Sequence, residues 1–295
     1  MHFFNTSPGR LVLLSIGVAT ISTAAPLIKL IPEVPSVLVA ASRLGFASLI
    51  LLPLGWRHRH AVGRQRPALV LAAGLCLALH FVSWIASLRY TSVASSVILV
   101  TLTPLLLVPA GYLMWGERLT RRLGLGIGLA IGGSVCIAWN DFQLSPPQAL
   151  YGDLLALGGA VMMAAYLVCG RLVRPSVPLP LYAGLVYASA ALCLWAVCLL
   201  SPVSILGYAG SAYLILLLLG LGPQLIGHTV VNWALAYLSP TIVAVVLLAE
   251  PVGASLLAWL WLGESVSWLQ GGGGVLILSG IGLVNVQAQP AAAPR

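Results

Sequence analysis

The sequence predicts an all-α integral membrane protein with ten transmembrane helices, arranged as two inverted five-helix repeats. Three observations support this prediction. Charged residues make up 7% of the 295-residue chain and hydrophobic residues 60%, whereas a soluble domain carries about 25% charged residues. Apolar runs of about 20 residues, the length needed to cross a bilayer, follow one another along the chain. The third observation is an internal duplication with an offset of 147 to 148 positions, which in a membrane chain favours a transporter.

Glycine, proline and arginine punctuate the chain between the apolar runs. The first run follows Arg10 and ends in small residues before Pro26, as a signal peptide would. Its removal would leave four spans against five in the second half, so we expect a retained first helix. The Ala/Pro-rich tail 288–295 is predicted to be disordered. The predicted spans cover about 11–31, 36–55, 68–88, 92–115, 122–140, 152–171, 181–201, 211–235, 240–262 and 269–287.

The duplication is clearest around two histidines, His80 and His228, which lie 148 positions apart. Further along the chain, after a one-residue gap in the alignment of the two halves, matched residues lie 147 positions apart. Chance similarity between hydrophobic helices is the alternative, and the paired polar positions argue against it. The predicted repeats cover residues 9–141 and 151–287. Further matched positions are Gly74 with Gly222, Leu77 with Leu225, Tyr90 with Tyr237, Ser92 with Ser239, Pro104 with Pro251, and Gly116-Glu117 with Gly263-Glu264.

Positive charge lies mainly on one side of the predicted membrane. With the N-terminus inside, eleven of the fourteen Lys and Arg residues fall in inner segments, which places both termini in the cytoplasm. Each half has five spans, an odd number, so the second half must run upside down relative to the first. The loop 57–67 is rich in arginine while its counterpart 201–211 carries no charge. This opposite bias is what an inverted-topology repeat requires.

A proline followed by Gly-Glu near the end of each fourth helix, from Pro104 to Glu117 and from Pro251 to Glu264, precedes a glycine-rich fifth helix in both halves. In these features the chain resembles the drug/metabolite transporter (DMT) superfamily, EamA family, over nearly its whole length. The resemblance implies a multi-pass protein of the cell inner (cytoplasmic) membrane that exports amino acids, drugs or other metabolites. Aromatic amino-acid exporters of the YddG type are a candidate branch.

Polar residues recur on matching faces of the third and eighth spans. Cys76, His80 and Trp84 are spaced i, i+4, i+8, and so are Gln224, His228 and Asn232 in the equivalent span. Polar groups are expensive at mid-membrane depth, so each is a candidate site residue. We expect the two faces to meet across a pseudo-twofold axis and to line a shared cavity. The alternative is that each histidine bonds a backbone carbonyl and only fixes packing.

Two charged residues, Arg43 and Glu250, lie well inside predicted spans, away from the span ends. A lone carboxylate at that depth is costly to ionise unless a cation or water stabilises it. Glu250 could couple protons, hold a substrate ammonium or neutralise Arg43. Arg43 is a brace, a snorkelling residue or a carboxylate anchor. If both face the cavity, one positive and one negative anchor would suit a zwitterion such as an amino acid.

Further candidates are Thr103, which could bond cargo or its own helix carbonyls, and the aromatic residues Tyr166 and Trp233, which with Trp84 could form walls or merely pack. Glycines on the fifth and tenth spans would let these two helices approach closely at the edge of the molecule, joining the halves or forming a dimer. These glycines are Gly124, Gly128, Gly132, Gly271 to Gly274, Gly280 and Gly282.

These features predict a secondary transporter that exports small metabolites, with amino acids as the leading cargo, by alternating access. The alternative within this class is proton-coupled efflux of hydrophobic cations. An intramembrane enzyme is disfavoured because no HExxH or paired-carboxylate pattern is found. No cofactor or metal is expected, because the five cysteines lack metal-ligand spacing. The short basic clusters do not indicate nucleic-acid binding. A small-molecule substrate and the lipid bilayer are the expected partners, and the protein could be a monomer or a homodimer.

Overall fold

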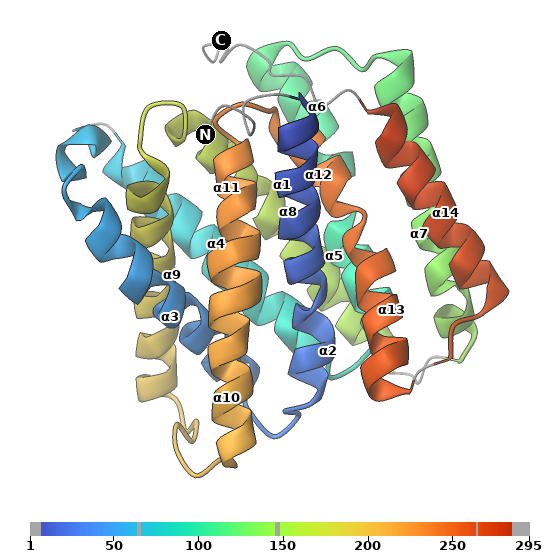
Figure 1. Ribbon diagram of the computed structural model, residues 1–295. Helices are drawn as coiled ribbons and strands as arrows, with labels where there is room; N and C mark the ends of the chain where they lie inside the picture. The colour runs from blue at the N-terminus through green and yellow to red at the C-terminus, as the bar shows by residue number, and fades with distance from the viewer. Residues whose placement is uncertain (1–6, 64–65, 145–147, 264, 285–295) are drawn as a thin grey trace.

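The computed structural model describes residues 7–63, 66–144, 148–263 and 265–284, and every regular element within these ranges is a helix (Figure 1). Glu264 and the tail 288–295 lie outside the described residues. The elements are α1 (Ser7–Ser22), α2 (Ala24–Lys29), α3 (Ser36–Trp56), η2 (Arg59–Val62), α4 (Pro67–Ser87), α5 (Val93–Thr101), α6 (Thr103–Trp115), α7 (Arg121–Leu144), α8 (Ala149–Val173), α9 (Leu179–Leu200), α10 (Gly210–Leu219), η3 (Gly220–His228), α11 (Thr229–Ala234), α12 (Pro240–Leu247), α13 (Glu250–Leu262) and α14 (Trp268–Leu283).

Within the described residues, eight helical stretches are long and apolar enough to cross a membrane. They match the predicted first to fourth and sixth to ninth spans. The two other predicted spans fall on α7, with 24 residues, and on α14, an apolar helix of 16 residues. The eight stretches are Gly9–Lys29, Ser36–Trp56, Pro67–Ser87, Val93–Trp115, Ala149–Val173, Leu179–Leu200, Gly210–Ala234 and Pro240–Leu262.

Several residues that recur between the halves cap equivalent helices. The hydroxyl of Ser92 accepts a hydrogen bond from the Ser95 amide at the start of α5, and Ser239 does the same for α12. Such N-caps satisfy amides that the first helical turn leaves unpaired. Gly116 and Gly263 end α6 and α13 with positive φ angles of 66° and 72°, a conformation that favours glycine. Part of the repeated sequence pattern is therefore explained by helix ends alone.

Glu117, directly after the Gly116 cap, is half-buried and faces α12 rather than solvent. Its Oε2 atom accepts a hydrogen bond from the Thr241 hydroxyl at 3.3 Å. Burial raises the pKa of this carboxyl above its ordinary value, and the hydrogen bond from Thr241 and the charge of Arg171 partly oppose that shift. Glu117 therefore contacts the second half of the chain from the end of the first.

Two of the spans break at equivalent places. The fourth span is interrupted at Leu102, between α5 and α6, and the ninth at Leu248 and Ala249, between α12 and α13. Pro104 and Pro251 lie in the first turns of α6 and α13. Proline has no amide proton to continue the preceding helix, so each span restarts at that point. Thr103 and Glu250 begin the restarted helices.

The helices form a bundle in which α3 packs along α9, α4 along α8 and α9, and α1 against η3 (Figure 1). The beginning of α1 and the end of α14 lie at the same end of this bundle, as the dark blue and dark red ends in Figure 1 show. The helices α3 and α9 are the second spans of the two halves, so at this place equivalent elements contact one another.

The helices α7 and α14 lie side by side at one edge of the bundle (Figure 1). A Cβ atom built on Gly280 would meet the Gly126 carbonyl oxygen at 2.5 Å, and one built on Gly126 would meet the Gly280 carbonyl oxygen at 2.7 Å. Gly133 and Gly273 oppose each other in the same way. The expected pairing of these two helices is therefore found. The expectation that all the named glycines make the contact is wrong in part: Gly128, Gly132, Gly271, Gly272 and Gly282 have nothing within 4 Å of a built Cβ, and Gly124 meets only Leu119.

Candidate binding cavity

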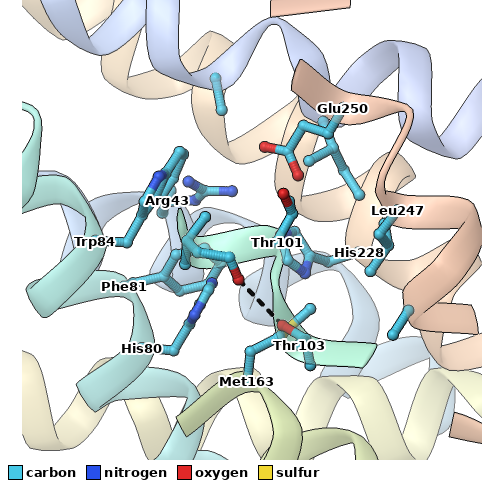
Figure 2. Close-up of a pocket in the computed structure, with 14 residues that line it drawn as sticks. Arg43, His80, Phe81, Trp84, Thr101, Thr103, Met163, His228, Leu247 and Glu250 are labelled. Carbon is cyan, nitrogen blue, oxygen red and sulfur yellow. Dashed lines mark hydrogen bonds between the residues drawn. The ribbon is translucent and has the colours of Figure 1, made fainter. Parts of the chain in front are cut away.

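A small cavity lies between the two halves of the chain, with walls from both (Figure 2). Its volume is about 20 Å³, which is room for roughly one water molecule. The cavity therefore has no room for a metabolite in this conformation. Its lining comes from the first, fourth and ninth spans and from α3, α4, α8 and η3: Ile21, Ala24, Arg43, His80, Phe81, Trp84, Val100, Thr101, Thr103, Met163, His228, Ala244, Leu247 and Glu250.

Arg43, in the middle of α3, is fully buried. Its Nε atom donates a hydrogen bond to Oε1 of Gln224 at 3.1 Å, and its guanidinium carbon lies 4.0 Å from the ring centroid of Phe81. The terminal nitrogens Nη1 and Nη2 have no hydrogen-bond partner among the described residues. An arginine held at Nε and stacked on an aromatic ring presents a fixed charged edge. Arg43 is thus held from two sides, and it does not reach bulk water as a snorkelling side chain would.

The two histidines face the cavity with their ring centroids 6.5 Å apart. The Nδ1 atom of His80 lies 2.9 Å from the Gly159 carbonyl oxygen. Because a carbonyl only accepts, Nδ1 carries the proton in this contact. The Nδ1 atom of His228 has no partner among the described residues. The alternative interpretation, a histidine bonded to a backbone carbonyl, therefore describes His80, whereas the same atom of His228 is unbonded.

Glu250, at the start of α13, is 7% exposed and lines the cavity with Thr101 and Thr103. Figure 2 shows its carboxylate and the Arg43 guanidinium pointing into the same space. The hydrogen bonds of Arg43 include none to Glu250, because both terminal nitrogens are unpartnered. Direct pairing of Arg43 with Glu250, one of the expectations for this residue, is therefore not what the structure shows.

Gln224 and Asn232, expected on the same face as His228, are buried behind the cavity wall. Asn232 accepts a hydrogen bond from the Tyr166 hydroxyl at 2.6 Å and donates one to the Tyr187 hydroxyl at 3.0 Å. The expectation that Gln224, His228 and Asn232 share one cavity-lining face is wrong, because η3 is a π-helix. A π-helix has more residues per turn than an α-helix, so the i, i+4, i+8 stripe does not continue straight through it.

Of the ten candidate residues, six line the cavity: Arg43, His80, Trp84, Thr103, His228 and Glu250. Gln224, Asn232 and Tyr166 support the wall from behind, and Trp233 packs half-buried against Tyr237 at a ring distance of 5.3 Å. The sequence reasoning missed Phe81, Thr101 and Met163 as lining residues. Phe81 adjoins His80 and Thr101 precedes the break at Leu102, and these neighbours are the signals that could have found them. Met163 carries no such signal.

The fold and the cavity define a helical membrane protein whose polar groups gather between two similar halves. The sequence profile of the EamA-like transporter family matches residues 10–139 and 150–286. The chain therefore belongs to this family of membrane transporters, which confirms the resemblance found in the sequence. A solved structure described as "Crystal structure of protein" has a TM-score of 0.77 and 23% identity, covering 94% of this chain and 96% of that one. That likeness concerns the fold. A comparison with curated protein sequences finds no match.

Proposed function

We propose that the protein is a secondary transporter that exports small metabolites, amino acids foremost, by alternating access. The observation that carries this proposal is the cavity between the halves, where Arg43, His80, His228 and Glu250 meet. Charged and ionisable side chains are costly in a membrane interior and usually mark a path for polar cargo. Transporters of repeated architecture bind cargo near mid-membrane, where the repeats meet.

The proposed architecture is ten spans, the eight candidate spans together with α7 and α14, in two inverted five-helix repeats. Two features support it. The start of α1 and the end of α14 lie at the same end of the bundle (Figure 1), and the equivalent pairs α3 with α9 and α7 with α14 pack on each other. The arginine-rich loops favour a cytoplasmic location for that end, with the protein in the inner membrane as a monomer or homodimer.

Alternating access requires the cavity to open to one side at a time. A volume of about 20 Å³ is too small for an amino acid, so the surrounding helices must move apart to admit cargo. The breaks at Leu102 and at Leu248–Ala249 adjoin the cavity. Interrupted helices bend at such points with less loss of backbone hydrogen bonding than continuous ones. We propose these breaks as hinges.

A second candidate cargo is a hydrophobic cation. Glu250 faces the cavity beside the aromatic rings of Phe81 and Trp84, and aromatic faces with a carboxylate attract organic cations. Under this alternative, Glu250 would hold the cation or a coupling proton. The positive charge of Arg43 in the same cavity disfavours it.

Uptake into proteoliposomes tests the proposal. The panel contains neutral and aromatic amino acids and cationic dyes, each with and without a pH gradient, and mass spectrometry checks that the cargo returns chemically unchanged. We expect amino-acid movement that is strongly reduced in His80→Ala, His228→Ala and Glu250→Gln, and retained in Gly132→Ala, whose added methyl group would meet nothing within 4 Å. Unchanged transport in all three cavity variants, or chemical conversion of the cargo, would remove the proposal.

A further inference from the structure

The polar groups at the central cavity are unusually rich in hydrogen-bond donors. Three buried residues that line it have side-chain nitrogens without a partner among the described residues: Arg43 (Nη1 and Nη2), Trp84 (Nε1) and His228 (Nδ1). The arginine and tryptophan nitrogens can only donate. A buried donor without an acceptor is destabilising, so these groups favour a ligand that supplies acceptors.

The polar groups that line the cavity are not hydrogen-bonded to these donors. Its two threonines donate to their own helix: Thr101 to the carbonyls of Val97 and Ile98, and Thr103 to that of Val100. Glu250 is the acidic residue of the lining, and it does not bond the terminal nitrogens of Arg43. The terminal nitrogens of Arg43 are therefore open to acceptors that a ligand would supply.

The orientation of Arg43 matches one kind of acceptor. Gln224 holds Nε, and the rings of Phe81 and Trp84 lie 4.0 and 6.0 Å from the guanidinium carbon. This arrangement leaves the edge with Nη1 and Nη2 unbonded. Two parallel N–H groups of an arginine form paired hydrogen bonds with the two oxygens of a carboxylate.

We propose that an acidic group, a carboxylate, is the obligatory part of the cargo and binds at Nη1 and Nη2 of Arg43. This inference rests on the proposed transport function and narrows its substrate class to carboxylic acids, amino acids included. An ammonium group is optional and lies toward Glu250. Amines without a carboxylate are not cargo under this inference, because they leave the donors of the cavity unpaired and add a second positive charge beside Arg43.

A second cleft supports an anionic cargo independently. It has a volume of about 320 Å³, and its charged lining residues are Lys29 and Arg89. The short helix α2 connects the two sites, since Ala24 lines the cavity and Ile28 lines the cleft. Both cations bond backbone carbonyls, Lys29 that of Thr91 and Arg89 that of Val34. Their charge nevertheless makes this cleft favourable to anions.

Matched ligands separate the acid from the amine. L-phenylalanine carries both groups, 3-phenylpropanoate only the carboxylate and phenethylamine only the ammonium; L-leucine, 4-methylpentanoate and 3-methylbutylamine repeat the series with a smaller side chain. Thermal unfolding of the purified protein in detergent measures binding, and counterflow in proteoliposomes measures transport. We expect both acids and amino acids to stabilise the protein and to exchange, and the amines to do neither. Amines that bind as well as the acids would overturn the inference, and so would a complete lack of binding by every carboxylate.

Variants then test whether the carboxylate of the ligand binds at Arg43. Arg43→Gln should weaken carboxylate binding at least about tenfold, Arg43→Lys should lose part of the affinity, and Glu250→Gln should still bind 3-phenylpropanoate. Unchanged carboxylate binding in folded Arg43→Gln would contradict the inference. If Arg43→Gln does not fold, Arg43→Lys and the wild-type ligand series decide the matter. Exchange of amines alone would leave transport standing without the acid requirement, whereas carboxylate binding without any exchange would leave the acid site standing without transport.

Discussion

The two halves of the chain meet in two very different regions, the central cavity and the edge formed by α7 and α14. At the edge, the backbones touch at Gly126 with Gly280 and at Gly133 with Gly273, and none of the unpartnered buried polar atoms of the described side chains lies on these helices. At the centre, polar residues from both halves face a small space, and several lack partners. Close packing without unsatisfied polar groups suits a fixed joint, whereas unsatisfied groups suit a site that binds something. The difference favours the edge as the joint between the halves and agrees with the proposal that the centre binds cargo.

The largest effect is expected at the edge. Gly133→Leu would push a side chain into the Gly273 backbone, and helix backbones cannot yield as a flexible side chain can. We expect a loss of about 3 kcal/mol of folding free energy, seen as a lower yield of monodisperse protein and a lower Tm. Gly132→Leu, one position away with open space around it, is the matched control. Equal behaviour of the two variants would show that the edge is not a rigid joint.

A smaller loss is expected behind the cavity wall. Asn232→Leu removes the partner of the Tyr166 and Tyr187 hydroxyls, and we expect it to lower stability by about 1–2 kcal/mol. Transport per folded molecule should change little, because Asn232 does not line the cavity. Trp233→Leu, at a half-buried neighbouring position, controls for general effects on α11. A transport defect in Asn232→Leu with normal stability would place this residue at the cargo instead.

The two histidines should differ, although they occupy equivalent positions. Both His80→Ala and His228→Ala should reduce transport about tenfold, the effect of losing roughly one hydrogen bond to cargo. His80→Ala should also lower the Tm, by an amount equivalent to about 1 kcal/mol, because it alone removes a bond to the Gly159 carbonyl. Unfolding curves of the two variants in the same detergent make the comparison. Identical losses of stability would mean that the hydrogen bond of His80 to the Gly159 carbonyl does not contribute measurably to stability.

The smallest effect is expected at Glu117, where burial raises the carboxyl pKa. A carboxyl whose pKa is higher in the folded protein than in the unfolded chain favours folding at low pH, and this contribution is lost as the pH rises through the folded-state pKa. Glu117→Gln cannot ionise, so its stability relative to wild type should improve as the pH rises from the ordinary pKa of a glutamate to the raised pKa of the folded protein. The exposed Glu33 provides the control variant Glu33→Gln. A difference between Glu117→Gln and wild type that does not vary with pH would contradict this explanation.

Much of the scaffold was predictable because its determinants are local. The length and hydropathy of the apolar runs placed the helical stretches, and the Ser92, Ser239, Gly116 and Gly263 caps follow from backbone groups that any helix end must satisfy. The clustering of polar residues at equivalent positions also placed six candidates on the cavity wall. Each of these inferences needs only the spacing of residues along one segment.

Other features depended on contacts between segments that are distant in sequence. Gly126 and Gly133, rather than Gly124, Gly128 and Gly132, meet α14, because the rotation of α7 about its axis is set by its neighbour. The π-helical turn of η3 separates Asn232 from the face that His228 presents to the cavity.

The sequence by itself therefore determined a membrane-spanning helical chain with a duplicated pattern, since hydrophobicity and capping act within one segment. Only the tertiary structure decided which polar atoms remain unpaired. The partners of Arg43, Gln224 on η3 and Phe81 on α4, come from other helices, and hydrogen-bond satisfaction depends on distances that no spacing along the chain can fix.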